Sequence, residues 1–143
     1  MAAGGLVRST EGNASARAGD LIAVSPSGLQ YDTLRAEDVC LVTSEGELVE
    51  GLEPSVELPM HLAVLAARPG VGAVVHTHSP RATVHPPVAV AVGRSGTAEL
   101  GEAVVEAAAG GNAVVIRDHG PVCFGVNLPE ALARAFALEE QAR

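Results

Sequence analysis

His76 and His78 end an apolar run, residues 71–79 (VGAVVHTHS), that is typical of a short buried strand. Because side chains alternate along a strand, residues two apart point to the same face. The two imidazoles would therefore share one space, as neighbouring ligands of a divalent metal ion do. The pattern by itself also fits surface or core histidines that happen to alternate. A metal site becomes the stronger interpretation when an acidic residue, Glu57, and a third histidine, His119, are considered with it.

Glu57 precedes an apolar stretch, residues 62–68, that is predicted to be helical, with Ser55 as N-cap and Pro59 in the first turn. Glu57 and His61 are four residues apart, so they would lie on one face of this helix. A carboxylate at this place usually serves capping and the helix dipole, and alone it does not indicate catalysis. We interpret His61 as a packing residue or as a support behind the site rather than as a ligand.

The elements that must position these residues are predicted from turn residues and hydrophobic periodicity. The turn at residues 25–28 (SPSG) either simply reverses the chain, which is favoured when it is considered alone, or cradles an anion with backbone N–H groups. Strands and helices alternate irregularly with hairpin-type connections, which predicts a single layered α/β domain over residues 1–143 with a mixed, largely antiparallel sheet. Strands are expected at residues 14–17, 20–24, 39–43, 47–50, 113–116 and 122–125, with a further apolar run at 88–92, and helices at 80–84, after Thr97 and after Asn127.

Composition narrows the class of protein. With 143 residues, 48% hydrophobic and 2% aromatic, the chain must form one core from small aliphatic side chains. A net charge of −8 and a pI near 5.0 argue against nucleic acid or an anionic membrane as partner. The absence of a long apolar stretch predicts a soluble cytoplasmic protein. Cys40 and Cys123 follow no C-x-x-C pattern and are expected to be buried reduced thiols.

In chain order, Gly12-Asn13, residues 25–28, Ser55-Val-Glu57, His76-x-His78 and His119-Gly120 resemble the class II aldolase/adducin family. The best-known enzyme of this family is L-fuculose-1-phosphate aldolase. Residues 68–79 and 112–120 are especially similar to the two metal-binding segments of the family, and the motifs extend over nearly the whole chain. The resemblance implies a three-layer αβα fold with a central mixed, mostly antiparallel sheet. It also implies a homo-oligomer, commonly a tetramer, with active sites at subunit interfaces.

The resemblance further implies a zinc ion, or another divalent ion, held by His76, His78 and His119. Glu57 would approach the metal when no substrate is bound and would act as the catalytic acid/base when it is. The expected reaction is the cleavage of a phosphorylated ketose, such as L-fuculose 1-phosphate, to dihydroxyacetone phosphate and an aldehyde. Four residues match positions that bind the substrate phosphate in the sugar-phosphate aldolases: Asn13, Ser27, Gly28 and Ser55.

The chain departs from the family pattern in several places. Val56 replaces the second of two small hydroxyl residues before the acidic residue, which removes one expected phosphate donor. Arg81 stands where an aromatic residue is common, residues 84–96 form a shorter connection, and the N-terminal helix and C-terminal tail are short or missing. The only tyrosine, Tyr31, does not match the tyrosine that the sugar aldolases take from a neighbouring subunit as proton donor.

These departures leave alternatives to the aldolase hypothesis. The same metal site could serve a sugar-phosphate epimerase or dehydratase, or aldol cleavage of a non-phosphorylated substrate, which the loss of a hydroxyl at Val56 slightly favours. A non-catalytic adducin-like scaffold is disfavoured, because a scaffold has no need for buried ionisable groups that are costly to desolvate. A truncated chain that folds but turns over little is a third alternative. The sequence assigns no role to His85.

Overall fold

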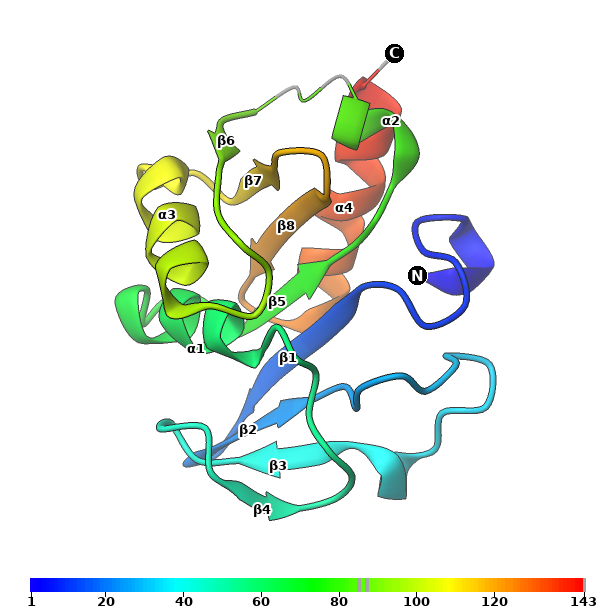
Figure 1. Cartoon of the computed structure of the whole chain (residues 1–143), viewed down its shortest axis with the longest axis vertical. Coiled ribbons are helices and arrows are strands. Elements are labelled where there is room, and N and C mark those ends of the chain that lie inside the picture. The colour runs from blue at the N-terminus through cyan, green and yellow to red at the C-terminus, as the bar shows by residue number, and fades with distance from the viewer. Residues whose placement is uncertain (85, 87, 143) are drawn as a thin grey trace.

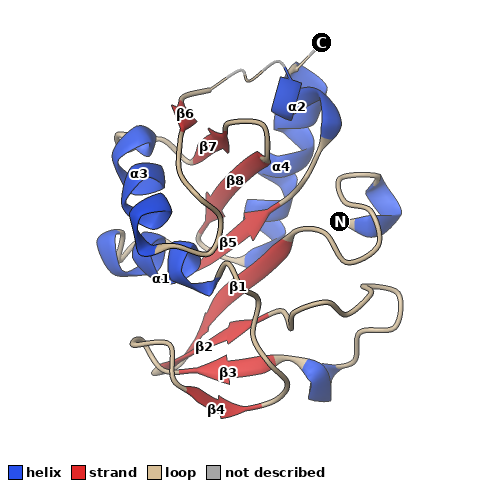
Figure 2. Cartoon of the chain, in the orientation of Figure 1, coloured by secondary structure: helices blue, strands red, loops and turns tan. Residues whose placement is uncertain are grey.

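A computed structural model describes residues 1–84, 86 and 88–142 of the chain. In this part of the chain, eight strands form one sheet in the order β4-β3-β2-β1-β5-β8-β7-β6 (Figures 1 and 2). Neighbouring strands are antiparallel, except that β6 and β7 are parallel. The prediction of an α/β fold with a mixed, mostly antiparallel sheet is confirmed.

The strands coincide with the apolar and β-branched runs of the sequence, and the helices with the capped, periodic segments. The strands are β1 (Asn13–Ala18), β2 (Leu21–Val24), β3 (Cys40–Val42), β4 (Leu48–Glu50), β5 (Ala73–His76), β6 (Val90–Ala91), β7 (Ala113–Ile116) and β8 (Gly120–Gly125). The helices are α1 (Leu58–Ala67), α2 (Pro80–Val84), α3 (Ala98–Ala108) and α4 (Leu128–Gln141), with 3-10 turns at Ala2–Gly4 and Ala36–Asp38. No helix among the described residues combines the length and apolarity that a membrane span requires.

Helices cover both faces of the sheet, which gives the expected three layers. Helices α1 and α3 pack on one face and α4 on the other (Figure 1). Neighbouring residues of β5 show the division, because Val74 belongs to the core under α1 and α3 while Val75 belongs to the core under α4. Cys40 and Cys123 are buried and free, as predicted. Burial raises the pKa of Cys123 to about 12, so this thiol stays protonated at neutral pH.

The start of α1 differs from the prediction. The helix begins at Leu58 with Glu57 at its N-cap, whereas the sequence indicated Ser55 as the cap. Ser55 closes a turn before the helix, because its carbonyl accepts the Leu58 N–H at 3.0 Å and its Oγ accepts the Glu57 N–H at 3.3 Å. Glu57 therefore lies at the N-terminal boundary of α1 rather than within its first helical turn. The other predicted N-caps, Thr97 and Asn127, are confirmed by their side-chain hydrogen bonds.

Strand β5 also ends earlier than the sequence suggested. It stops at His76, so His78 lies two residues beyond the strand. The Thr77 N–H still donates to the carbonyl of Pro121 at 3.0 Å, which continues the pairing with β8 past the strand end. The alternation of side chains is thereby retained, and the two histidines reach the same space. His85 lies outside the described residues.

Candidate metal centre

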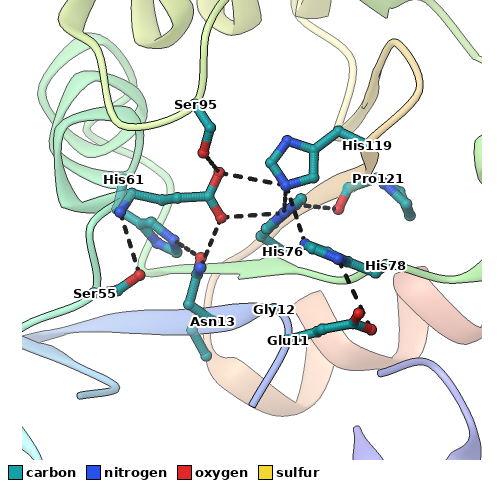
Figure 3. Close-up of polar contacts among 12 residues, drawn as sticks. Glu11, Gly12, Asn13, Ser55, His61, His76, His78, Ser95, His119 and Pro121 are labelled. Atoms are coloured by element: carbon teal, nitrogen blue, oxygen red, sulfur yellow. Dashed lines mark hydrogen bonds and ion pairs between the residues drawn. The ribbon is translucent and has the colours of Figure 1, made fainter. Parts of the chain in front are cut away.

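Four side chains from separate parts of the chain converge at the end of β5. The Nε2 atom of His119 lies 3.3 Å from Nε2 of His76 and 3.0 Å from Nε2 of His78. Glu57 places Oε2 3.2 Å from Nε2 of His76 and Oε1 3.7 Å from Nε2 of His119. Figure 3 shows the three imidazoles directed toward one another. One potential ligand atom from each of the four residues lies within 4.8 Å of the others.

These separations suit a single divalent ion. With metal–ligand distances of about 2.0–2.1 Å, the ligand atoms of a tetrahedral site are about 3.3–3.4 Å apart. The four contacts given above, from 3.0 to 3.7 Å, lie on both sides of this value, and the whole set of ligand atoms stays within 4.8 Å. In addition, Nδ1–H of His76 donates to the carbonyl of Pro121 at 3.0 Å, so Nε2 presents its lone pair to the centre. The residues present therefore fit a metal ion, and the chemistry of the set, three imidazoles and a carboxylate, fits zinc or a similar metal.

Burial controls the charges of this group. Complete burial, together with repulsion from His119, lowers the pKa of His76 to about 3, although Glu57 opposes the shift. Burial favours the neutral form of Glu57, but attraction to His76 and hydrogen bonds from Asn13 and Ser95 lower its pKa to about 2. The two hydrogen bonds persist when His76 is neutral, and they favour the ionised form of Glu57. His76 is thus a neutral imidazole beside a carboxylate, which is the protonation state that metal ligands require.

A tight turn between β7 and β8 holds His119. Asp118 has a φ of 56° and Gly120 has a φ of 152°. Both values lie in the region of positive φ that favours glycine. A Cβ atom on Gly120 would lie 2.0 Å from the carbonyl oxygen of Thr77. Glycine is therefore required for the turn to pass close to the segment that presents His78.

Two hydrogen-bond donors hold the Glu57 carboxylate. Asn13 Nδ2 donates to Oε2 at 2.8 Å, and Ser95 Oγ donates to Oε1 at 2.7 Å (Figure 3). Asn13 lies opposite His76 in the β1–β5 pairing, which places its amide beside the metal centre. Ser95 lies in the connection from β6 to α3 and was not predicted from the sequence. Nothing in its local sequence distinguishes it from an ordinary turn serine.

A cavity of about 210 Å³ opens beside the Glu57 carboxylate. Its lining includes Val56 and Ser95 but, among the residues that the structure describes, no lysine or arginine, so an anion here would be bound by neutral donors. Two cavities of about 410 Å³ lie elsewhere, but no histidine lines them in the described part of the chain. The smaller cavity is therefore the candidate substrate pocket. All four residues predicted to bind phosphate line it: Asn13, Ser27, Gly28 and Ser55.

Tyr31 and His61 lie outside this lining. The Tyr31 hydroxyl donates to the carbonyl of Gly12 at 2.7 Å, and burial raises the pKa of Tyr31. It fixes the turn before Asn13 rather than facing the histidines. His61 is fully buried and contacts Ser15 and Asn13 through its two ring nitrogens. This agrees with the interpretation of His61 as a supporting residue.

The comparisons with known proteins agree with this geometry. Residues 1–86 and 84–143 match the family model of the class II aldolase and adducin N-terminal domain. The chain belongs to this family. The two matches meet within the connection that the sequence analysis expected to be shortened, so the class II aldolase model aligns with the chain on both sides of it.

Individual relatives include enzymes with different reactions. A 5-methylthioribulose-1-phosphate/5-deoxyribulose-1-phosphate aldolase of Rhodospirillum rubrum is 40% identical, over 96% of this chain and 72% of that protein. An L-ribulose-5-phosphate 4-epimerase of Salmonella paratyphi B is 30% identical, over 97% of this chain and 76% of that protein. The structure of an L-fuculose 1-phosphate aldolase superposes with a TM-score of 0.90 at 30% identity, over 96% of this chain and 75% of that one. Family membership thus establishes the aldolase superfamily but not the individual reaction.

Proposed function

We propose that this protein is a metal-dependent aldolase that cleaves a phosphorylated ketose to dihydroxyacetone phosphate and an aldehyde. The observation that supports this most is the convergence of His76, His78, His119 and Glu57 at ligand distances beside a polar pocket. Glu57 and His76 are buried and His78 and His119 are half-buried, and desolvating such ionisable groups is costly unless they are used together. A non-catalytic scaffold would have no reason to retain them, which disfavours the adducin-like alternative.

The histidine Nε2 atoms would hold the ion, zinc or another divalent metal. When bound, the ion supplies Lewis-acid stabilisation of the negative charge that develops as the carbon–carbon bond breaks. Glu57 would move the proton, because its carboxylate is ionised at neutral pH and lies at the pocket. Its two hydrogen-bond donors fix its oxygens before substrate arrives, which reduces the cost of orienting the base.

The substrate phosphate would be bound by four further residues of the pocket lining. Ser27 and Ser55 offer hydroxyl groups, because their backbone N–H groups already donate to the carbonyls of Glu53 and Ser25. Gly28 offers a backbone N–H, and Asn13 has a second amide hydrogen beyond the one given to Glu57. Binding of phosphate by neutral donors is common at helix N-termini and tight turns. Val56 offers no hydroxyl, so one donor fewer is available than in the family pattern.

The relatives supply test substrates. The aldolase of R. rubrum is named for 5-methylthioribulose 1-phosphate and 5-deoxyribulose 1-phosphate, and these join L-fuculose 1-phosphate in a screen for released dihydroxyacetone phosphate. The epimerase relative supports a second candidate, conversion of L-ribulose 5-phosphate, which is assayed in parallel. Aldehyde release without epimer formation would support the aldolase proposal, and epimer formation alone would replace it.

Metal content comes before the substrate screen. The protein is purified without added metal or chelator, together with His76→Ala and Glu57→Gln. We expect about one divalent ion per chain, lost in His76→Ala, and Glu57→Gln should bind the ion more weakly while losing cleavage. If the unaltered protein takes up no metal even when zinc is offered, the scaffold alternative gains and Glu57 loses its catalytic role. We also propose a homo-oligomer, and a sedimentation profile of monomer alone would refute it.

A further inference from the structure

Behind Glu57, a row of buried polar side chains leads away from the pocket. Asn13 and Ser15 are two residues apart on β1 and share a face, while Glu57 and His61 are four apart at the start of α1. Two residues of strand extend about 6.7 Å and four residues of helix about 6 Å, so the two pairs can lie opposite each other. The side chains interlock accordingly. His61 Nε2 lies 2.5 Å from Asn13 Oδ1, and His61 Nδ1 lies 2.7 Å from Ser15 Oγ.

The directions of the hydrogen bonds in this row follow from the orientation of the Asn13 amide. Its Nδ2 lies 2.8 Å from Oε2 of Glu57 and donates to it, because an amide nitrogen only donates. Asn13 Oδ1 then faces His61, and Nε2 of His61 must carry a hydrogen to donate to it. A neutral imidazole has only one N–H, so Nδ1 is an acceptor and the Ser15 hydroxyl donates to it. Each contact in the row fixes the next.

We propose that His61 is a positioning residue for Glu57 that acts through the Asn13 amide. Without the N–H of His61, the Asn13 amide could flip and turn Oδ1 toward the carboxylate, where two acceptors would repel. Asn13, Ser15 and His61 are 5%, 1% and 0% exposed, so bulk water cannot replace the missing donor. The role rests on the proposed function of Glu57, and it gives Asn13 a second task besides phosphate binding.

Two substitutions of His61 separate positioning from simple packing. The amide nitrogen of Gln reaches about as far as Nε2 of histidine, so His61→Gln can still donate to Asn13. His61→Asn is shorter and can serve only the Ser15 side. Both variants place an uncharged amide in the same buried site, and thermal unfolding monitors any general loss of packing.

Zinc affinity and, where cleavage is found, kcat and KM are measured for both variants. We expect His61→Asn to bind zinc about 10–100-fold more weakly, as is typical for loss of a group that orients a metal ligand. Its kcat should fall by a similar factor while KM changes less, and His61→Gln should stay close to the unaltered protein. Equal losses in the two variants, or no loss in either, would overturn the proposal.

A spectroscopic measurement on the unaltered protein needs no variant to fold. Nitrogen-15 NMR of the imidazole side chains, with the His61 signals assigned from their absence in His61→Gln, should show the neutral tautomer with its hydrogen on Nε2 at neutral pH. A hydrogen on Nδ1 would overturn the proposal. If no ketose phosphate is cleaved, the proposed function fails, but zinc affinity and the tautomer still decide the role of His61.

Discussion

The buried histidine behind Glu57, His61, should make the metal-free protein lose stability as the pH falls below the pKa of an ordinary imidazole. Burial lowers the pKa of His61 from 6.5 to about 4, with the carboxylate of Glu57 opposing the shift. The unfolded chain therefore binds this proton at a higher pH than the folded chain. The stability is fully present above pH 6.5 and is lost progressively as the pH falls toward 4.

The size of the loss follows from the shift. One pKa unit corresponds to about 1.4 kcal/mol, so the whole shift amounts to roughly 3 kcal/mol near pH 4. About 2 kcal/mol of this is lost already between pH 7 and pH 5, because an unfolded histidine is then mostly protonated while the folded one is hardly so. A loss of this size is a large part of the stability of a typical domain.

The assay is urea unfolding at pH 7 and pH 5 in the presence of a chelator, for the unaltered protein and for His61→Gln. Other groups, including buried His76, titrate in both proteins, so the difference between them isolates His61. We expect the unaltered protein to lose about 2 kcal/mol more than the variant between the two pH values. If both proteins lose the same amount, His61 is not held neutral by burial and the reasoning fails.

Three further substitutions test the pocket and the metal turn. Ser95→Ala removes a hydrogen bond to Glu57. Because Ser95 is solvent-exposed, we expect the lower end of the range for hydrogen bonds to charged groups, which corresponds to about a tenfold fall in kcat. Ser95→Thr should retain activity, and an unchanged kcat in Ser95→Ala would exclude a role of Ser95 in turnover. Gly120→Ala should cost at least about 2 kcal/mol in thermal or urea unfolding and weaken metal binding, because of its φ and the clash of its Cβ. The matched control is Gly70→Ala, which meets open space; similar losses in both would contradict the argument. Val56→Ser adds a hydroxyl to the pocket and should lower KM for a phosphorylated ketose about fivefold; an equal gain with a non-phosphorylated analogue would show that the hydroxyl does not meet phosphate.

Much of the fold could be predicted because its signals are local. Alternation and β-branching located β7 with the bounds that the structure shows, and the caps Thr97 and Asn127 located the starts of α3 and α4. The start of α1 was misplaced at Ser55 because Ser55 has a typical capping side chain, whereas Glu57, the observed N-cap, makes no side-chain cap hydrogen bond. The choice between them depends on a turn whose residues line the pocket, and that packing is not visible in local sequence.

Some residues of the site could be predicted from local sequence, whereas others depend on how distant segments pack. The pairing of His76 with His78 followed from strand alternation, whereas His119 and Glu57 joined them through the family resemblance, since their nearness depends on the whole sheet. Ser95 could not be found, because the path of an exposed connection decides what it contacts. The row of buried polar side chains behind Glu57 was partly predictable, since alternation on β1 puts Ser15 on the same face as Asn13.

The histidine ligands and the groups that support the Glu57 carboxylate lie on different elements, so substitutions of the two sets should have different effects. The last residue of β5, the segment after it and the turn between β7 and β8 present the histidines, and a β8 carbonyl orients His76. Donors from β1 and from the connection before α3 hold Glu57 instead. Substitution of a histidine ligand should therefore abolish metal binding, while substitution of a group that supports Glu57 should weaken it only in part and act mainly on proton transfer. A site in which one element held all four groups would not separate the two effects, so the division between complete and graded loss of metal tests the architecture itself.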